Sequence, residues 1–69
     1  MERVQVVSSN IASIGYDPDT ETLEIEFLDG SVYQYYNVPN YEHDGLMSAN
    51  SHGGYLAANI KGTYSYSRV

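Results

Sequence analysis

Residues 23–36 read LEIEFLDGSVYQYY, and this stretch predicts the β-hairpin around which the rest of the chain folds. Leu23, Ile25 and Phe27 alternate with glutamates, which is the period-two pattern of a strand with one buried face. Asp29-Gly30 follows at the position of a tight turn. A second run of β-prone residues begins directly after that turn, so the two runs are expected to pair as neighbouring antiparallel strands.

The length of the hairpin loop decides which side chains share the buried face. A two-residue loop, closed by a type I′ turn, would place Gln34 among the apolar residues. A three-residue loop, with Gly30 left-handed in a bulge, pairs Ile25 with Tyr33 instead. We favour the three-residue loop because a one-residue slip would invert the whole buried set. That set is Leu23, Ile25, Phe27, Tyr33 and Tyr35.

The composition predicts one small acidic domain, covering residues 1–69. A chain of 69 residues lies near the lower limit for a self-sufficient core, so self-association is a natural way to bury more surface. Nine Asp and Glu against three Lys and Arg give a formal net charge of −6, which disfavours a broad nucleic-acid interface. Eight tyrosines suit ligand pockets and protein interfaces, because tyrosine combines apolar area with a polar tip.

Several classes are excluded or disfavoured by what the sequence lacks. There is no cysteine, which removes disulfides, thiolate metal sites and a cysteine nucleophile. No apolar run approaches the roughly 20 residues of a membrane span. The first ten residues lack the apolar core of a signal peptide, so a cytoplasmic location is expected.

The segments around the hairpin predict one more strand and two extended ends. Residues 11–16 predict the strand that precedes the hairpin, with Ala12, Ile14 and Tyr16 on one face. Residues 3–7 are short and rich in valine, and we expect an edge strand or an arm there. Residues 63–69 alternate tyrosine with serine, and an extended tail is expected.

Two short helices are predicted between the hairpin and the tail. The first covers residues 40–49, with Asn40 as its cap, and the second covers about residues 52–61, with Ser51 as its cap and Gly62 as its stop. The expected fold class is α+β: a three-stranded antiparallel β-meander with two short helices on one face and extended terminal segments. The predicted core consists of Ile11, Ile14, Leu23, Ile25, Phe27, Tyr33, Tyr35, Val38, Leu46, Tyr55 and Ile60.

The order of these motifs resembles that of the KTSC domain, a small module also found at the C-terminus of some lysyl-tRNA synthetases. The motifs are Ser8-Ser9-Asn10-Ile11, Ile14-Gly15-Tyr16-Asp17, Leu23-x-Ile25-x-Phe27-x-x-Gly30, Tyr33-x-Tyr35-x-x-Val38-Pro39, Ala49-x-Ser51-x-Gly53-x-Tyr55, Ile60-Lys61-x-x-Tyr64 and Val69. The resemblance covers nearly the whole chain without gaps. It implies a soluble, non-secreted module of a kind common in bacteria and their viruses. The family has no established activity, so the resemblance predicts the fold better than the function.

Two polar segments are candidates for holding an anion. Ser8-Ser9-Asn10 offers three small hydrogen-bonding side chains before a strand, although these side chains could instead cap a turn. The helix start Ser51-His52-Gly53-Gly54 offers free N–H groups to a phosphate, although its glycines could instead let the helix pack closely on the sheet.

A third candidate group combines cations with aromatic rings near the end of the chain. Interleaved cations and rings are what base stacking with phosphate contact would use, although the tyrosines could instead pack on the sheet or on a second subunit. This group contains Lys61, Tyr64, Tyr66 and Arg68, with Arg3 from the other end. Taken together, the candidate ligand-binding residues are Arg3, Ser8, Ser9, Asn10, Ser51, His52, Gly53, Tyr55, Lys61, Tyr64, Tyr66 and Arg68.

Metal and catalytic sites are disfavoured. The acidic turn 17–21 begins like a calcium loop but lacks the glycine and the final glutamate that the loop requires. Glu24 and Glu26 are successive outward positions on a strand, as on a solvated face. His43 and His52 lie in different predicted helices, without the further ligands that a metal site needs.

The leading hypothesis is a non-enzymatic binding module, a homo-oligomer that holds a small anionic ligand of the nucleotide kind and needs no cofactor. Symmetry would combine the few cations of each chain into one basic pocket. If the chain is viral, sequestration of a host nucleotide signal would suit such a design. The alternative is a protein- or RNA-interaction module of the kind fused to tRNA synthetases, and acidity counts against RNA.

Overall fold

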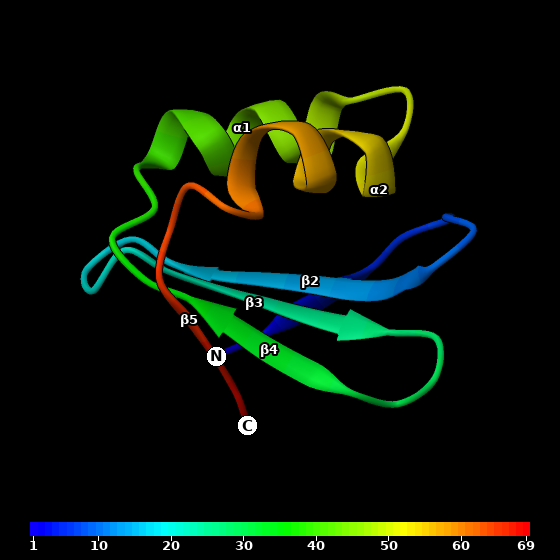
Figure 1. Cartoon of the computed structure of the whole chain (residues 1–69), viewed down its shortest axis with the longest axis horizontal. Coiled ribbons are helices and arrows are strands. Elements are labelled where there is room, and N and C mark those ends of the chain that lie inside the picture. The colour runs from blue at the N-terminus through cyan, green and yellow to red at the C-terminus, as the bar shows by residue number, and fades with distance from the viewer.

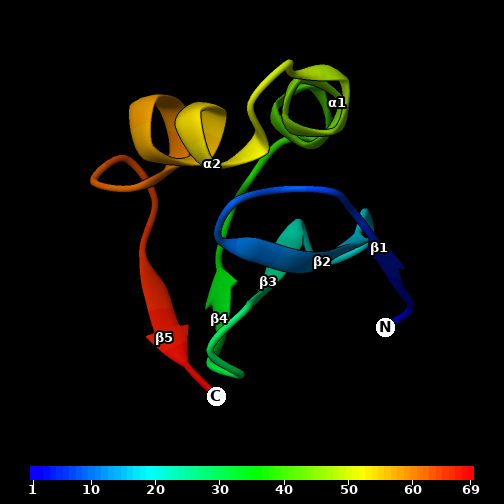
Figure 2. The same ribbon diagram turned by 90° about the vertical axis from the view of Figure 1, so that its right-hand side faces the viewer.

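The computed structural model describes residues 1–69. It contains a five-stranded antiparallel sheet with helices on one face (Figure 1). The strands follow one another across the sheet in the order β1-β2-β3-β4-β5, which leaves β1 and β5 at opposite edges (Figure 2). The elements are β1 (Arg3–Gln5), β2 (Ile11–Asp17), β3 (Thr22–Phe27), β4 (Val32–Tyr35), α1 (Asn40–Ser48), α2 (His52–Tyr55), the π-helical turn η1 (Leu56–Ile60) and β5 (Tyr66–Arg68).

The predicted α+β class is confirmed, but the three-stranded sheet is a correction: the sheet has five strands. Both ends of the chain join it, because β1 pairs with β2 and β5 pairs with β4. Residues 3–7 were expected to form an edge strand or an arm, and β1 is the edge strand. The tail was expected only to be extended, because all three residues of β5 are exposed and no buried alternation indicated a paired strand. Gly15 permits the close approach of β1, since a Cβ added there would lie 2.8 Å from Cγ of Arg3.

The central hairpin has the three-residue register. Ile25 lies opposite Tyr33 and Leu23 lies opposite Tyr35. Gly30 adopts a φ of +91°, the left-handed conformation that the bulged loop requires. The predicted loop type and register are therefore both confirmed.

A bulge in β2 changes the predicted face of that strand. Ile11 lies opposite Phe27 whereas Ser13 lies opposite Glu26, so Ala12 is the extra residue. The bulge lets Ile11 and Ile14 both point into the core, and both are buried. The prediction that placed Ala12 on a regularly alternating face was wrong, because a strict period of two does not hold across a bulge.

The two helices were predicted in the right places, and one of their two caps was wrong. Ser51 caps α2, since its Oγ accepts a hydrogen bond from the N–H of Gly54 at 3.0 Å. Asn40 is the first residue of α1 and caps nothing; Pro39 holds the cap position in an extended conformation, with no side-chain bond. The C=O of Pro39 instead accepts the N–H of Glu42 and closes the first turn.

The predicted second helix consists of two kinds of helix. After α2 the chain widens into η1, where the N–H of Lys61 donates to the C=O of Leu56 at 2.8 Å, five residues back. Gly62, with a φ of +81°, then turns the chain away as predicted. None of the helices has both the length and the apolar content needed to cross a membrane.

Nine buried residues form the core between the helices and the sheet. They are Ile11, Ile14, Leu23, Ile25, Tyr35, Val38, Leu46, Leu56 and Ile60. The prediction omitted Leu56 and included Phe27, Tyr33 and Tyr55, which are only partly buried. Phe27 and Tyr33 remain partly exposed because they line a hollow beside Lys61 and Gly62, where the helical segment has ended.

Candidate functional site

A hollow of about 550 Å³ lies on the helix-covered side of the sheet, between β3, β4 and β5 and the end of η1. We call it the aromatic hollow. It is lined by Phe27, Ser31, Tyr33, Tyr35, Lys61, Gly62 and Tyr66. Its volume is in the range of small-molecule sites, and its lining mixes ring surface with a few polar groups, as such sites do.

Four aromatic rings make a continuous surface in the hollow. The Phe27 and Tyr33 rings meet edge to face with their centroids 5.7 Å apart. The Tyr66 ring lies 5.8 Å from that of Tyr33 and 5.7 Å from that of Tyr35. Tyr35 is buried at the base, while Tyr66 is 61% exposed at the margin. The exposed ring surface is therefore open to a planar partner.

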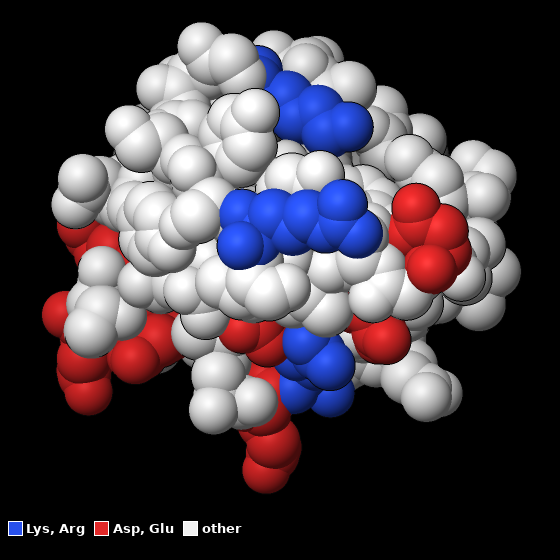
Figure 3. All heavy atoms as spheres, turned by 60° about the horizontal axis from the view of Figure 1, so that its bottom comes forward, with Lys and Arg blue, Asp and Glu red and all other residues white.

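Positive charge borders these rings. The Nζ atom of Lys61 lies 5.4 Å from the centroid of Phe27, a cation–π contact. Arg68 lies opposite Tyr33 in the ladder between β4 and β5, so its side chain shares the face of the hollow. Figure 3 shows basic side chains on a broad uncharged surface in its upper and central part, and further basic atoms among carboxylates below them. Burial raises the pKa of Tyr35, which keeps its phenol neutral and able to donate a hydrogen bond.

The Ser8–Asn10 segment and the start of α2 meet each other, but not the hollow. Ser8 Oγ accepts the N–H groups of Asn10 and Ile11, each at 3.3 Å. The Asn10 side chain packs against Gly53, leaving no room there for a Cβ. His52 contacts the C=O of Leu46 through Nδ1 at 2.8 Å. Ser8 therefore caps a turn, as one of the two interpretations of this segment expected. Gly53 does allow a close approach, but it packs against the side chain of Asn10 and not against a strand of the sheet. Ser9 is exposed.

Tyr55 and Tyr64 do not line the hollow, and their hydroxyls bind one carboxylate. The Tyr55 hydroxyl donates to Oε1 of Glu42 at 2.6 Å, and the Tyr64 hydroxyl donates to Oε2 at 3.0 Å. Glu42 is 9% exposed, so this three-residue cluster ties α1 to α2 and to the segment before β5. Burial, followed by the bond to Glu42, raises the pKa of Tyr64 to about 12.

Glu42 was not among the residues singled out from the sequence, although its position in α1 carries a signal. Glu42 lies four residues before Leu46, a predicted core position, and so shares its inward stripe of α1. A carboxylate on that stripe requires hydrogen-bond donors, and tyrosine hydroxyls are the donors that a chain rich in tyrosine can supply.

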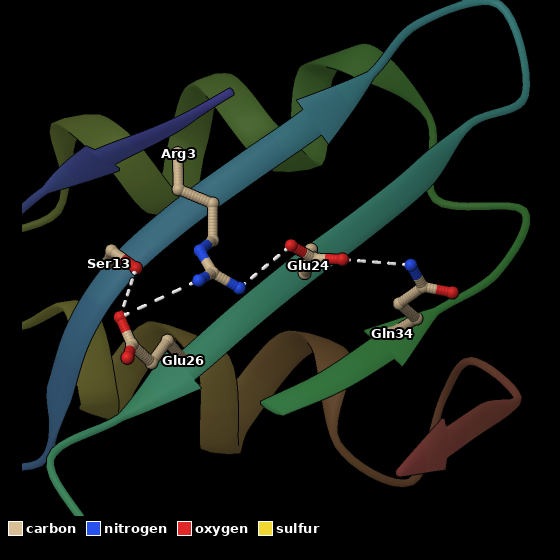
Figure 4. Close-up of polar contacts among 5 residues, drawn as sticks. All are labelled: Arg3, Ser13, Glu24, Glu26 and Gln34. Atoms are coloured by element: carbon tan, nitrogen blue, oxygen red, sulfur yellow. Dashed lines mark hydrogen bonds and ion pairs between the residues drawn. The ribbon is translucent and has the colours of Figure 1, made fainter. Parts of the chain in front are cut away.

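Arg3 belongs to a different face from the other cations. On the open side of the sheet its guanidinium lies 2.9 Å from Oε2 of Glu24 and 4.0 Å from Oε1 of Glu26 (Figure 4). Ser13 donates to Glu26, and Gln34 donates to Glu24, each at 2.8 Å. Arg3 is therefore separated by the sheet from Lys61 and Arg68, with which the sequence analysis grouped it.

Of the predicted ligand residues, the structure brings Lys61, Tyr66 and Arg68 together around the hollow. It adds Phe27, Tyr33 and Tyr35, which the sequence analysis assigned to the core. The alternation that identified their face was correct, but no local pattern showed where the covering helices would end.

The fold and the hollow thus define a small α+β module with a partly covered aromatic surface on its sheet. The family model for the KTSC domain matches residues 7–64. A crystal structure of a KTSC domain protein from Yersinia pestis superposes with a TM-score of 0.96 at 44% identity, covering 99% of this chain and 96% of that one. The chain belongs to the KTSC domain family.

Two further relatives show where such domains occur. An uncharacterized protein of Stutzerimonas stutzeri is 39% identical, and the match covers 100% of this chain and 99% of that protein. A lysine–tRNA ligase of Nostoc sp. is 39% identical over 61 residues, which cover 88% of this chain but only 11% of the ligase. The same domain therefore occurs both in a protein of similar length and as a small part of a synthetase.

Proposed function

We propose that this KTSC domain is a non-catalytic binding module whose aromatic hollow takes a nucleotide-like ligand, with the base on the rings and the phosphate at the cations. The observation that carries the proposal is the hollow itself, where four rings adjoin one another and Lys61 lies 5.4 Å from the ring centre of Phe27. Every nucleobase has a π face, so aromatic stacking accepts a base without requiring a particular sequence.

The charge distribution favours a small anion at this place over others. The chain carries a net charge of −6, so most of its surface repels a phosphate. Arg3 is already paired with carboxylates, whereas no ion pair occupies Lys61 or Arg68. These two residues border the rings, and a ligand that combines a flat apolar base with a phosphate matches both features.

The same features support one nucleotide more than a long nucleic acid. Two cations on one face can contact one or two phosphates, whereas affinity for a duplex is built from many such contacts. The similarity to part of a lysine–tRNA ligase supports a second candidate, in which the hollow accepts a single unpaired base of an RNA.

Calorimetry with the four ribonucleoside 5′-monophosphates tests the proposal. We expect saturable heat with at least one of them, recovery of the ligand unchanged, and weakening by Lys61→Met. Tyr66→Ala should weaken binding by about 5- to 150-fold, the effect of one lost base–ring stack. Tyr41→Ala is the matched control, because Tyr41 is 70% exposed on α1 and does not line the hollow.

The outcomes separate the candidates. No heat with any monophosphate, or equal loss from Tyr66→Ala and Tyr41→Ala, would overturn the proposal. Binding heat seen only with a single-stranded oligoribonucleotide would favour the second candidate, in which the hollow accepts an unpaired base of an RNA.

A further inference from the structure

The outer side of β5 is an unpaired sheet edge beside the aromatic hollow. Val69 donates its N–H to Val32, and Tyr36 donates its N–H to the C=O of Ser65, so the odd-numbered residues of this segment face β4. Antiparallel bonding alternates along a strand, and the N–H and C=O groups of Tyr66 and Arg68 therefore point outward. An edge of this kind is a template for another strand.

We infer that a second copy of this chain pairs its β5 with this β5 about a two-fold axis, and that Arg68 of each copy completes the hollow of the other. The pairing itself does not depend on the ligand. The statement about the hollow rests on the proposed function.

The length and bonding pattern of β5 select one register for this pairing. The strand is three residues long, and only a two-fold axis through Ser67 places all three residues opposite a residue of the second copy's β5. Tyr66 then lies opposite Arg68 of the second copy, and the outward N–H and C=O groups of both residues find partners. Ser67 faces its own counterpart in a non-hydrogen-bonded pair, where side chains come closest.

This register brings a cation of one copy to the ring of the other. Tyr66 and Arg68 are two residues apart, so both side chains lie on the hollow side of the sheet. Arg68 of the second copy therefore lies beside Tyr66, whose exposed ring borders the hollow. The paired hollow gains a cation–π contact and one more cation, in addition to its own Lys61 and Arg68, for an anionic ligand.

Charge favours the β5 edge over the β1 edge as the meeting place. The segment 61–69 carries Lys61 and Arg68 and no acidic side chain. At the other edge, Arg3 follows Glu2 and faces Glu24 and Glu26. Two copies of a chain with a net charge of −6 therefore repel each other least through β5. Because only short strands pair, the dimer should be weak and depend on concentration.

Opposite charges at Ser67 test the register. The Ser67 side chain lies on the open face, where it contacts the Tyr36 hydroxyl, so changing it leaves the lining of the hollow intact. In sedimentation experiments we expect wild-type dimers, monomers for Ser67→Lys alone and for Ser67→Glu alone, and dimers again when the two variants are mixed. Dimers that persist in both single variants, or a mixture that stays monomeric, would overturn the inference.

A cysteine at the same position gives a second, covalent readout. The chain has no cysteine, so Ser67→Cys can form a disulfide only with another copy. Ser67→Cys should oxidise to a dimer much faster than Ser48→Cys, which changes another exposed serine, on α1, and serves as the matched control. Equal rates for the two variants would overturn the inference.

Calorimetry with the same nucleoside monophosphates links the interface to the hollow. Ser67→Lys retains every lining residue but loses Arg68 of the second copy, and we expect binding weaker by about two- to fivefold, the effect of one exposed cation–π contact. Unchanged affinity would overturn the statement that the second copy completes the hollow. If the protein is a dimer that binds no monophosphate, the proposed function is wrong and the inferred interface stands. If the wild-type protein is a monomer that binds a monophosphate, the inferred interface is wrong and the proposed function stands.

Discussion

The two faces of the same sheet differ in how completely their side chains are paired or covered by other residues. On the open face, Glu24 contacts both Arg3 and Gln34, and Glu26 contacts Ser13 (Figure 4). On the helix-covered face, Ile25 is fully buried, while Phe27, two residues further along the same strand, borders a hollow. A surface whose polar groups already have partners offers little to a ligand. At the uncovered end of the other face, by contrast, aromatic ring surface stays exposed around the hollow.

The largest expected effect is on the free energy of unfolding, and it should differ between the buried and the partly exposed end of β3. Ile25→Ala removes a side chain with 0% exposure, and we expect a loss of about 2–5 kcal/mol in the free energy of unfolding. Phe27→Ala removes a larger but only partly buried ring and should lose less than about 3 kcal/mol. Urea denaturation of both variants measures the difference. A greater loss for Phe27→Ala would show that the hollow is a part of the core.

The second expected effect is the loss of stability when the hydrogen bonds that tie α1 to α2 and to the segment before β5 are removed. Glu42→Ala leaves the hydroxyls of Tyr55 and Tyr64 without their acceptor, and we expect a loss of about 1–3 kcal/mol in the free energy of unfolding. Asp44→Ala, an exposed carboxylate on the same helix, is the matched control and should change stability little. Similar losses in the two variants would mean that the tyrosine bonds contribute nothing measurable.

The same cluster predicts a dependence of stability on alkaline pH. The pKa of Tyr64 is raised from its ordinary value of 10.0 to about 12, so above pH 10 the unfolded chain releases a proton that the folded chain retains. The stabilising contribution is therefore complete below pH 10 and is lost as the pH rises toward 12. Urea midpoints across this range should fall, and less steeply in Tyr64→Phe than in Tyr36→Phe, which removes a tyrosine hydroxyl from the open face. Identical slopes would argue against the shift.

The smallest effect should come from the open face. Arg3→Gln removes ion pairs at a partly exposed site, and we expect a loss of about 0–1 kcal/mol that shrinks as salt is added. Nucleotide affinity should be unchanged by Arg3→Gln but reduced by Lys61→Met, which removes the same charge from the other face. A shared loss of affinity would mean that net charge, and not the hollow, attracts the ligand.

The fold was predictable where a local pattern carried the information. Alternating residues in β3 and the left-handed Gly30 specify the hairpin register, and Ser51 with Gly62 mark both ends of the second helical region. The edge strand β5 was not predictable as a strand, because its pairing with β4 leaves all its residues exposed.

The candidate site was predictable only in part. Lys61, Tyr66 and Arg68 were named from the interleaving of cations and rings near the end of the chain. Phe27 and Lys61 are distant in sequence and meet only through the packing of η1 on the sheet. A local pattern cannot contain that contact, and the same is true of the bond between Tyr64 and Glu42.

The π-helical turn η1 links the position of Lys61 beside Phe27 to the packing of the core. Its bond from Lys61 to Leu56 spans one residue more than an α-helical bond. Losing one codon among the exposed residues 57–59 would restore α-helical bonding and rotate the residues that follow by about 100° relative to those before. The buried Ile60 would rotate together with Lys61, so the wider turn that places this cation beside Phe27 cannot be lost without moving a core residue.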